Sequence, residues 1–323
     1  MTRLAPALAF MLSALATPAF AQVKKLPRPP SPPVVAAPPP AAADADLAYG
    51  AYQRGFYLTA LNEATKRAQQ NDPAAMTLLG EIYAQGLGVP RDDAKAAQWY
   101  RLAAGHGDTH AMFALAMFNF EGRAGARNPE EGAKLLDQAA KLGHPLAAYD
   151  LGLLYLDGRQ FPQDFPHAAQ LFQAAADKGN PEAQYALATL YKEGRGVPKD
   201  HAQAARLMGA ASVAGNLDAM VEYAIAEFNG DGLPKNEAAA AQLFLRAARR
   251  GSQIAQDRLA RVLMAGRGMP ANATEAVKWH IIAQAGGSSD PDLDVFAGKQ
   301  PKEVRDAADA AAKKWLATAA PRS

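Results

Sequence analysis

The chain has 323 residues, with 34 Lys and Arg against 32 Asp and Glu and a formal net charge of +2. This balance excludes a whole-molecule field that would favour nucleic acid or a membrane surface. The lack of cysteine excludes disulfide bonds, thiolate metal sites, a cysteine nucleophile and a lipidated cysteine. Abundant alanine, a strong helix former, and the lack of alternating Val, Ile and Thr predict an all-α protein.

Residues 1–21 have the pattern of a secretory signal peptide. Arg3 supplies the positive charge, residues 4–16 form a short apolar run, and residues 19–21 read Ala-Phe-Ala, an A-x-A cleavage site. The apolar run is shorter than the roughly 20 residues that span a bilayer. We therefore expect export to the periplasm with cleavage after Ala21; a retained N-terminal anchor is the alternative.

Residues 22–46 are predicted to form a proline-rich disordered linker. Their centre, residues 24–40, reads KKLPRPPSPPVVAAPPP, a composition that favours extended polyproline II. The segment is read mainly as a solvated tether. Alternatively, Pro27, Pro29, Pro30 and Pro33 present a ligand for an aromatic groove.

Residues 47–73 are predicted to be an incomplete first unit, an N-terminal capping helix pair. Tyr49, Tyr52, Phe56 and Leu58 have the apolar spacing of a helix pair, and Gly55 marks its turn. A terminal unit must differ from the others because one of its faces has no neighbour to bury it.

Six full units follow over residues 74–287, and each is predicted to form a helix, a glycine-rich turn and a second helix. The first turn glycine recurs every 36 residues, at Gly86, Gly122, Gly158, Gly194, Gly230 and Gly266. Such a fixed period indicates a stacked-repeat architecture. Glycine after each helix is typical of a left-handed C-cap.

The second helix of each unit begins after an Asp or Asn in one register. These residues are Asp92, Asn128, Asp164, Asp200, Asn236 and Asn272. Their side-chain oxygens suit the N-cap, where they accept an unpaired helix amide, so we interpret them as structural and not catalytic. Core anchors are expected at Leu79 and its equivalents in the first helices. In the second helices they are expected at Trp99, Leu135, Leu171, Leu207, Leu243 and Trp279.

After Gly287 the period breaks. Residues 288–323 are predicted to form a loop, up to Gly298, and one amphipathic capping helix over residues 301–319. Asp290, Asp292 and Asp294 alternate like the start of a calcium loop, but the glycine and distal glutamate of such a loop are missing.

The first unit carries an almost complete repeat motif: Ala75, Leu79, Gly80, Tyr83, Gly86, Gly88, Val89, Pro90, Asp92, Ala97, Trp99, Tyr100, Ala103, Ala104 and Gly107. This pattern resembles the Sel1-like repeat, a relative of the tetratricopeptide helix pairs. The second and third units depart from it in their turns, at Ala124-Gly125 and Gln160-Phe161. The resemblance implies a right-handed α-solenoid that serves as a protein-interaction scaffold; bacterial periplasmic members act as adaptors or regulators.

Two features are candidates for binding a cell-envelope protein. The first is an apolar stripe on the first helices of units two and three, Phe113, Met117, Phe120, Tyr149, Leu153 and Leu156. Part of this stripe is expected to line the concave groove of the solenoid and to hold a partner segment; core packing is the alternative. The second is a basic tract in units five and six, in which Arg258 and Arg261 face an acidic partner or form a solvated surface.

Catalytic and metal-binding motifs are missing from the sequence. There is no H-E-x-x-H, Walker A loop, G-x-S-x-G or S-x-x-K, and Gly107 interrupts the pair His106 and His110 at a helix end. We therefore predict a non-enzymatic scaffold without cofactor, metal or nucleic-acid partner, and with no transmembrane segment in the mature chain. The alternatives are a peptidoglycan-associated envelope protein and, last, a hydrolase of the β-lactamase-like Sel1 type.

Overall fold

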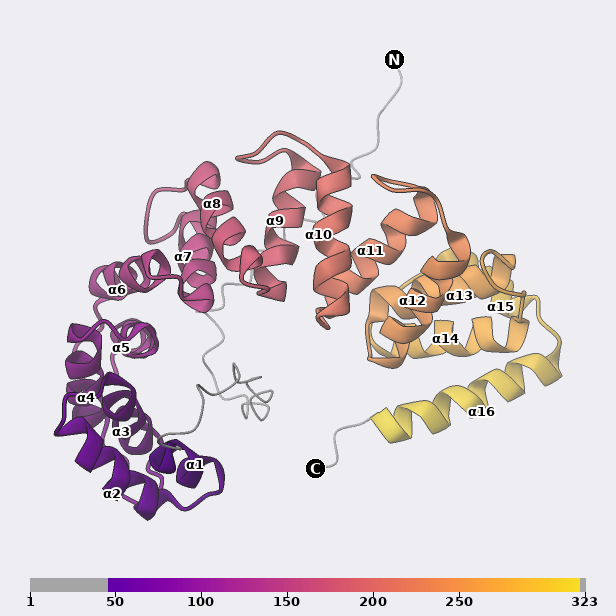
Figure 1. Cartoon of the computed structure of the whole chain (residues 1–323). Helices are drawn as coiled ribbons and strands as arrows, with labels where there is room; N and C mark the ends of the chain where they lie inside the picture. The colour runs from indigo at the N-terminus through magenta and orange to yellow at the C-terminus, as the bar shows by residue number, and fades with distance from the viewer. Residues whose placement is uncertain (1–45, 320–323) are drawn as a thin grey trace. The chain divides into compact units, whose positions relative to one another are not determined.

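A computed structural model describes residues 46–319 of the chain (Figure 1). The predicted signal peptide and all but the last residue of the predicted linker lie outside the described residues. Within residues 46–319 there are sixteen helices and no strand. They are α1 (Leu47–Gln53), α2 (Tyr57–Ala68), α3 (Pro73–Gln85), α4 (Asp93–Gly105), α5 (Thr109–Glu121), α6 (Pro129–Lys141), α7 (Pro145–Asp157), α8 (Phe165–Asp177), α9 (Pro181–Glu193), α10 (His201–Val213), α11 (Leu217–Asn229), α12 (Glu237–Arg249), α13 (Gln253–Ala265), α14 (Ala273–Ala285), α15 (Pro291–Gly298) and α16 (Lys302–Ala319).

The chain folds into two compact units, which meet in sequence between Asp164 and Phe165. Unit 1 contains α1 to α7, and unit 2 contains α8 to α16. Inside each unit, every helix up to α14 packs against the helix that follows it in sequence, which makes each unit a stretch of α-solenoid (Figure 1). The 36-residue period runs through the boundary without interruption, so the repeat pattern itself does not indicate it.

Local capping explains why the helices α3 to α14 all have the same length of 13 residues. Each first helix ends on a glycine in the left-handed conformation, with φ between 66° at Gly266 and 77° at Gly230. The side-chain oxygens of five of the Asp and Asn residues, Asp92, Asn128, Asp200, Asn236 and Asn272, accept the backbone N–H three residues later. Asp164 directly precedes α8, and its own N–H donates to the Tyr155 carbonyl at 3.0 Å.

A second turn glycine joins consecutive repeats. At Gly268, φ is 77°, and a Cβ would lie 2.1 Å from the Glu237 carbonyl oxygen of the preceding repeat. At Gly232, a Cβ would likewise lie 2.1 Å from the His201 carbonyl oxygen. Only a glycine permits both the left-handed conformation and this close approach. In the third repeat the same register holds Gln160.

In the first, third and fifth repeats the deepest position of the second helix lies one residue after the predicted anchor, whereas the predicted anchors Leu135, Leu207 and Trp279 are buried as expected. Tyr100, Phe172 and Phe244 are buried to 2% exposure or less, whereas their neighbours Trp99, Leu171 and Leu243 are only partly buried. Successive helical residues point about 100° apart, so the inward direction depends on how the helix is rotated against its partner. At Tyr100 the space comes from Gly80 of α3, where a Cβ would lie 2.4 Å from the tyrosine ring.

The segment after Gly287 is more ordered than expected. Instead of a loop up to Gly298 it contains α15, whose N-cap Asp290 is 2% exposed and accepts the N–H groups of Asp292 and Leu293. The last helix, α16, packs along α14 (Figure 1). The ring of Trp315 meets that of Trp279 edge-on, with centroids 5.8 Å apart. Together α15 and α16 cover the end of the sixth repeat.

Candidate partner-binding faces

The first helices of repeats two and three bury one side and leave the other accessible. We call the accessible side of α5 and α7 the first-helix face. It consists of His110, Ala114, Met117 and Glu121 on α5 and of Leu146, Asp150, Leu153 and Asp157 on α7. These positions follow the i, i+4, i+7 spacing of one helical face. Leu146 is 45% exposed, and Met117 and Leu153 are half-buried, so the face offers apolar contact area.

The predicted apolar stripe only partly coincides with this face. Phe120 is 4% exposed and packs against Gly132 of α6, where a Cβ would lie 2.9 Å from its ring, so it belongs to the core and cannot contact a partner. Phe113 is half-buried and stacks on the His144 ring, with ring centroids 5.0 Å apart. Tyr149 and Leu156 are half-buried beside the first-helix face. Met117 and Leu153 lie on the accessible line, whereas Phe113 and Phe120 lie one residue away from it, because periodicity does not specify the rotation of a helix.

Two histidines from neighbouring repeats meet beside this face. His144 is the N-cap of α7, and its Nδ1 accepts the Ala147 N–H at 3.1 Å. The ring is therefore the tautomer that carries hydrogen on Nε2, which donates to His110 Nδ1 at 3.2 Å. Burial and the neighbouring His110 lower the pKa of His144 to about 4. His144 thus acts as a neutral cap, and protonation of its Nδ1 would break the contact with the Ala147 N–H.

In the sequence, His110 lies four residues from His106 but 34 residues from His144, so the spacing does not indicate this pair. The missed signal is positional: His144 occupies the N-cap register that Asp72, Asp108, Asn180, Asn216 and Ser252 occupy in the other first helices. A histidine in a register of small hydrogen-bond acceptors indicates a capping role.

Asp150 lies between Leu146 and Leu153 on the first-helix face. Burial raises the pKa of its carboxyl to about 7. A carboxylate in poorly solvated surroundings gains from a nearby cation, because the cation replaces the stabilisation that water no longer provides. This face therefore combines apolar area with one carboxyl suited to a cationic group.

The two arginines predicted to bind a partner have different environments in unit 2. Arg258 is exposed on α13. Arg261, one turn later, donates from Nε and Nη2 to the two carboxylate oxygens of Asp290, at 2.5 and 2.8 Å. This bidentate pair attaches α15 to α13, which makes Arg261 a structural residue instead of a partner contact.

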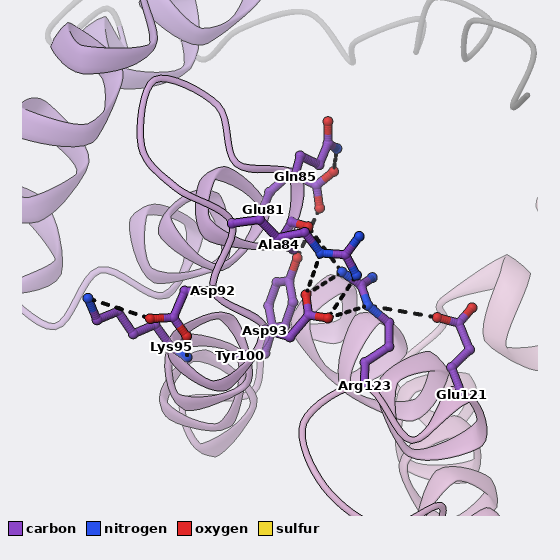
Figure 2. Close-up of polar contacts among 10 residues, drawn as sticks. Glu81, Ala84, Gln85, Asp92, Asp93, Lys95, Tyr100, Glu121 and Arg123 are labelled. Carbon is purple, nitrogen blue, oxygen red and sulfur yellow. Dashed lines mark hydrogen bonds and ion pairs between the residues drawn. The ribbon is translucent and has the colours of Figure 1, made fainter.

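Other polar side-chain pairs also join consecutive repeats. Figure 2 shows Arg123 reaching across from repeat two to Asp93, with Nη2 2.6 Å from the Asp93 carboxylate and 3.0 Å from the Ala84 carbonyl oxygen. The guanidinium also lies over the Phe118 ring at 4.0 Å. Hydrogen bonds from Arg91 and Arg123 lower the pKa of Asp93 to about 2. In unit 2, the same registers pair Arg267 with Glu237, at 2.5 Å, and Asp231 with His201, at 2.6 Å. These contacts join side chains of consecutive repeats, so the groups that make them are paired within the chain.

Within residues 46–319, no three His, Asp or Glu side chains come together in an arrangement that could hold a metal ion. Over the same range, no helix combines the length and the apolar character needed to cross a bilayer.

Comparison with known proteins agrees with the repeat architecture. The family model described as Sel1 repeat matches six consecutive segments, residues 73–108, 109–144, 145–180, 181–216, 217–252 and 253–288. The chain belongs to the Sel1 repeat family. The crystal structure of a Sel1 repeat protein from Oxalobacter formigenes is similar over 80% of this chain and 100% of that one, with a TM-score of 0.62 and 26% identity.

A second similar structure is a protective antigen present in uropathogenic Escherichia coli strains, which displays an SLR fold. It matches 82% of this Sel1 repeat protein and 65% of its own chain, with a TM-score of 0.56 and 24% identity. No curated protein sequence matches the chain. The Sel1 repeat fold generally serves as a protein-interaction scaffold.

Proposed function

We propose that this Sel1 repeat protein is an exported adaptor of the bacterial periplasm that binds a segment of an envelope protein on its first-helix face. The observation that carries the proposal is the accessible apolar line of Met117, Leu146 and Leu153. In a water-soluble repeat array, apolar side chains that remain accessible on one face favour a protein partner. The proposal includes no catalytic step, and the family typically provides scaffolds instead of enzymes.

Asp150 indicates the chemistry of the partner segment. Its carboxyl lies among Leu146 and Leu153, with a pKa of about 7 that burial has raised. A Lys or Arg of the partner placed there would restore the ionised carboxylate, and flanking apolar residues would cover the two leucines. The partner segment is therefore apolar with one basic residue, in the manner of an amphipathic helix laid on an apolar face.

Partner capture in intact cells tests this function. We would crosslink the tagged full chain and compare it with Leu153→Glu, which places a charge on the face, and with Lys134→Glu, which changes a charge at the exposed second-helix position 134. One dominant envelope protein should be captured by the wild type and by Lys134→Glu but lost from Leu153→Glu. Equal capture by all three chains would refute the first-helix face. Enrichment on purified cell-wall sacculi without a protein partner would instead favour a peptidoglycan-associated role.

Export is a separate element of the proposal and rests on the pattern of residues 1–21. Mass spectrometry of the chain from a periplasmic fraction should find Gln22 at its N-terminus. Recovery of the uncleaved chain from the membrane fraction would instead show a retained anchor.

A further inference from the structure

Exposed apolar side chains are concentrated at the N-terminal end of unit 1. Ten large hydrophobic residues are exposed among the described residues, and four of them, Leu47, Tyr49, Phe56 and Leu58, lie within residues 47–58. Their exposures range from 42% for Tyr49 to 63% for Leu47. A single exposed leucine is ordinary, but such a concentration on a short stretch marks a surface that something covers.

Three tyrosines form a connected row at this end, which we call the tyrosine ladder. The rings of Tyr49 and Tyr52 are stacked with centroids 6.3 Å apart, and the Tyr57 ring meets Tyr52 edge-on at 5.9 Å. Tyr57 and Leu58 also lie against the first repeat, where a Cβ on Gly88 would come within 3.0 Å of Tyr57 Cβ. The ladder is therefore held in place by α1, α2 and the first repeat, with Tyr49 exposed and the other two rings half-buried.

In the tyrosine ladder, the hydroxyl of Tyr52 is a hydrogen-bond donor that lies near the carboxylate of Glu81. Burial, followed by the nearby carboxylate of Glu81, raises the pKa of Tyr52 to about 12. Like any tyrosine, Tyr52 carries its hydroxyl proton at neutral pH and can donate it to a hydrogen bond. Aromatic rings that carry protonated hydroxyls suit a polyproline II helix. Its backbone carbonyls have no internal partners, and its proline rings fit between aromatic side chains.

We infer that the tyrosine ladder is a polyproline-binding site and that its occupant is this chain's own segment KKLPRPPSPP, residues 24–33. The segment supplies the required prolines, and Lys24, Lys25 and Arg28 complement Glu81 in charge. The proposal does not depend on the first-helix face or on its partner.

The length of the connecting chain permits this contact. Twelve residues, 34–45, join Pro33 to the first described residue, Asp46. At about 3.1 Å per residue they reach on the order of 37 Å, and α1 is only about 10 Å long. Attachment through a short connection gives the segment a high effective concentration at the ladder, so it should compete strongly with any proline-rich peptide in solution.

The test measures binding of a fluorescently labelled peptide of residues 23–35 to the mature chain, residues 22–323, by fluorescence anisotropy. A variant chain in which Pro27, Pro29, Pro30, Pro32 and Pro33 are replaced by serine should bind this peptide at least tenfold more tightly than the wild type, because its own segment no longer competes. In the same background, Tyr49→Ala should weaken binding at least tenfold, whereas Tyr191→Ala in unit 2 should not.

Three results would overturn the inference. Absence of binding to the serine-substituted chain would show that the ladder is not a polyproline site. Equal affinity of the wild-type and serine-substituted chains would show that the chain's own segment is not the occupant. Unchanged binding by Tyr49→Ala would place the site elsewhere. Far-UV circular dichroism of each variant separates these results from misfolding, and Tyr49 is chosen because its exposed ring contributes least to packing.

Discussion

Replacement of Gly268 by alanine tests whether the turn glycines join the repeats. Gly268 has φ 77°, and a Cβ would lie 2.1 Å from the Glu237 carbonyl oxygen, a backbone atom in the first turn of α12. The left-handed conformation costs about 1–2 kcal/mol for alanine. Displacing a backbone carbonyl from a packed contact adds roughly 1–3 kcal/mol. We therefore expect Gly268→Ala to lower the free energy of unfolding by about 2–5 kcal/mol.

Gly251 provides the matched control in the same unit. Its φ is 91°, and a Cβ there would have no heavy atom within 4 Å. Gly251→Ala therefore carries only the backbone strain, which the reduced entropy of the unfolded chain partly offsets, for a net loss of about 1 kcal/mol.

Urea denaturation, monitored by tryptophan fluorescence, measures the difference in stability between Gly268→Ala and Gly251→Ala. Trp279 and Trp315 report on the end of unit 2, which is useful because a repeat array can unfold in steps. With a typical urea slope of about 2 kcal/mol/M, Gly268→Ala should lower the midpoint by roughly 1–2.5 M and Gly251→Ala by about 0.5 M. Equal shifts for the two variants would refute the close-contact argument, because backbone conformation alone would then account for both.

Further predictions concern the charged groups. Arg261→Ala leaves Asp290, which is 2% exposed, without its cation, and should lower the free energy of unfolding of unit 2 by about 3–5 kcal/mol. Arg258 is exposed, so Arg258→Ala should change this free energy by no more than about 0.5 kcal/mol. Thermal denaturation of the two variants compares these effects. The folded-state pKa of His144, about 4, is below its unfolded value of 6.5, so its contribution to stability is present above pH 6.5 and is lost as the pH falls towards 4. Between pH 7.5 and 4.5 this loss should reach about 2–3 kcal/mol, and His144→Asn, which keeps the cap, should remove it from the urea midpoints. The contribution of Asp150 to stability depends on pH in the opposite direction, because burial raises its pKa to about 7. Its protonated form favours folding at low pH, and this contribution is lost as the pH rises through 7. Asp150→Asn should therefore raise the urea midpoint at pH 8, and a lower midpoint would contradict the assigned burial of the carboxyl.

The sequence alone determined the repeat, its caps and its helical content. A glycine every 36 residues acts through its own backbone conformation, and the Asp or Asn before each second helix acts through its side-chain oxygen on an N–H three residues later. Their roles therefore do not depend on distant residues. This explains why the ends of the first helices and the starts of the second helices followed from the pattern. It also explains why α15 was missed: its N-cap Asp290 lies outside the period and is stabilised by Arg261, 29 residues earlier.

Tertiary structure decided which side of each helix is accessible and which charges are paired. Phe120 and Met117 are three residues apart in one helix, yet Gly132 of α6 leaves a space that Phe120 fills, and Met117 stays half-exposed. The pairs formed by His144 with His110 and by Arg123 with Asp93 join residues 34 and 30 positions apart. A period specifies that equivalent residues lie in equivalent places, but the rotation of a helix about its axis is set by the volume of the side chains opposite it. Which side chains lie opposite a given helix is decided only when the helices pack against each other.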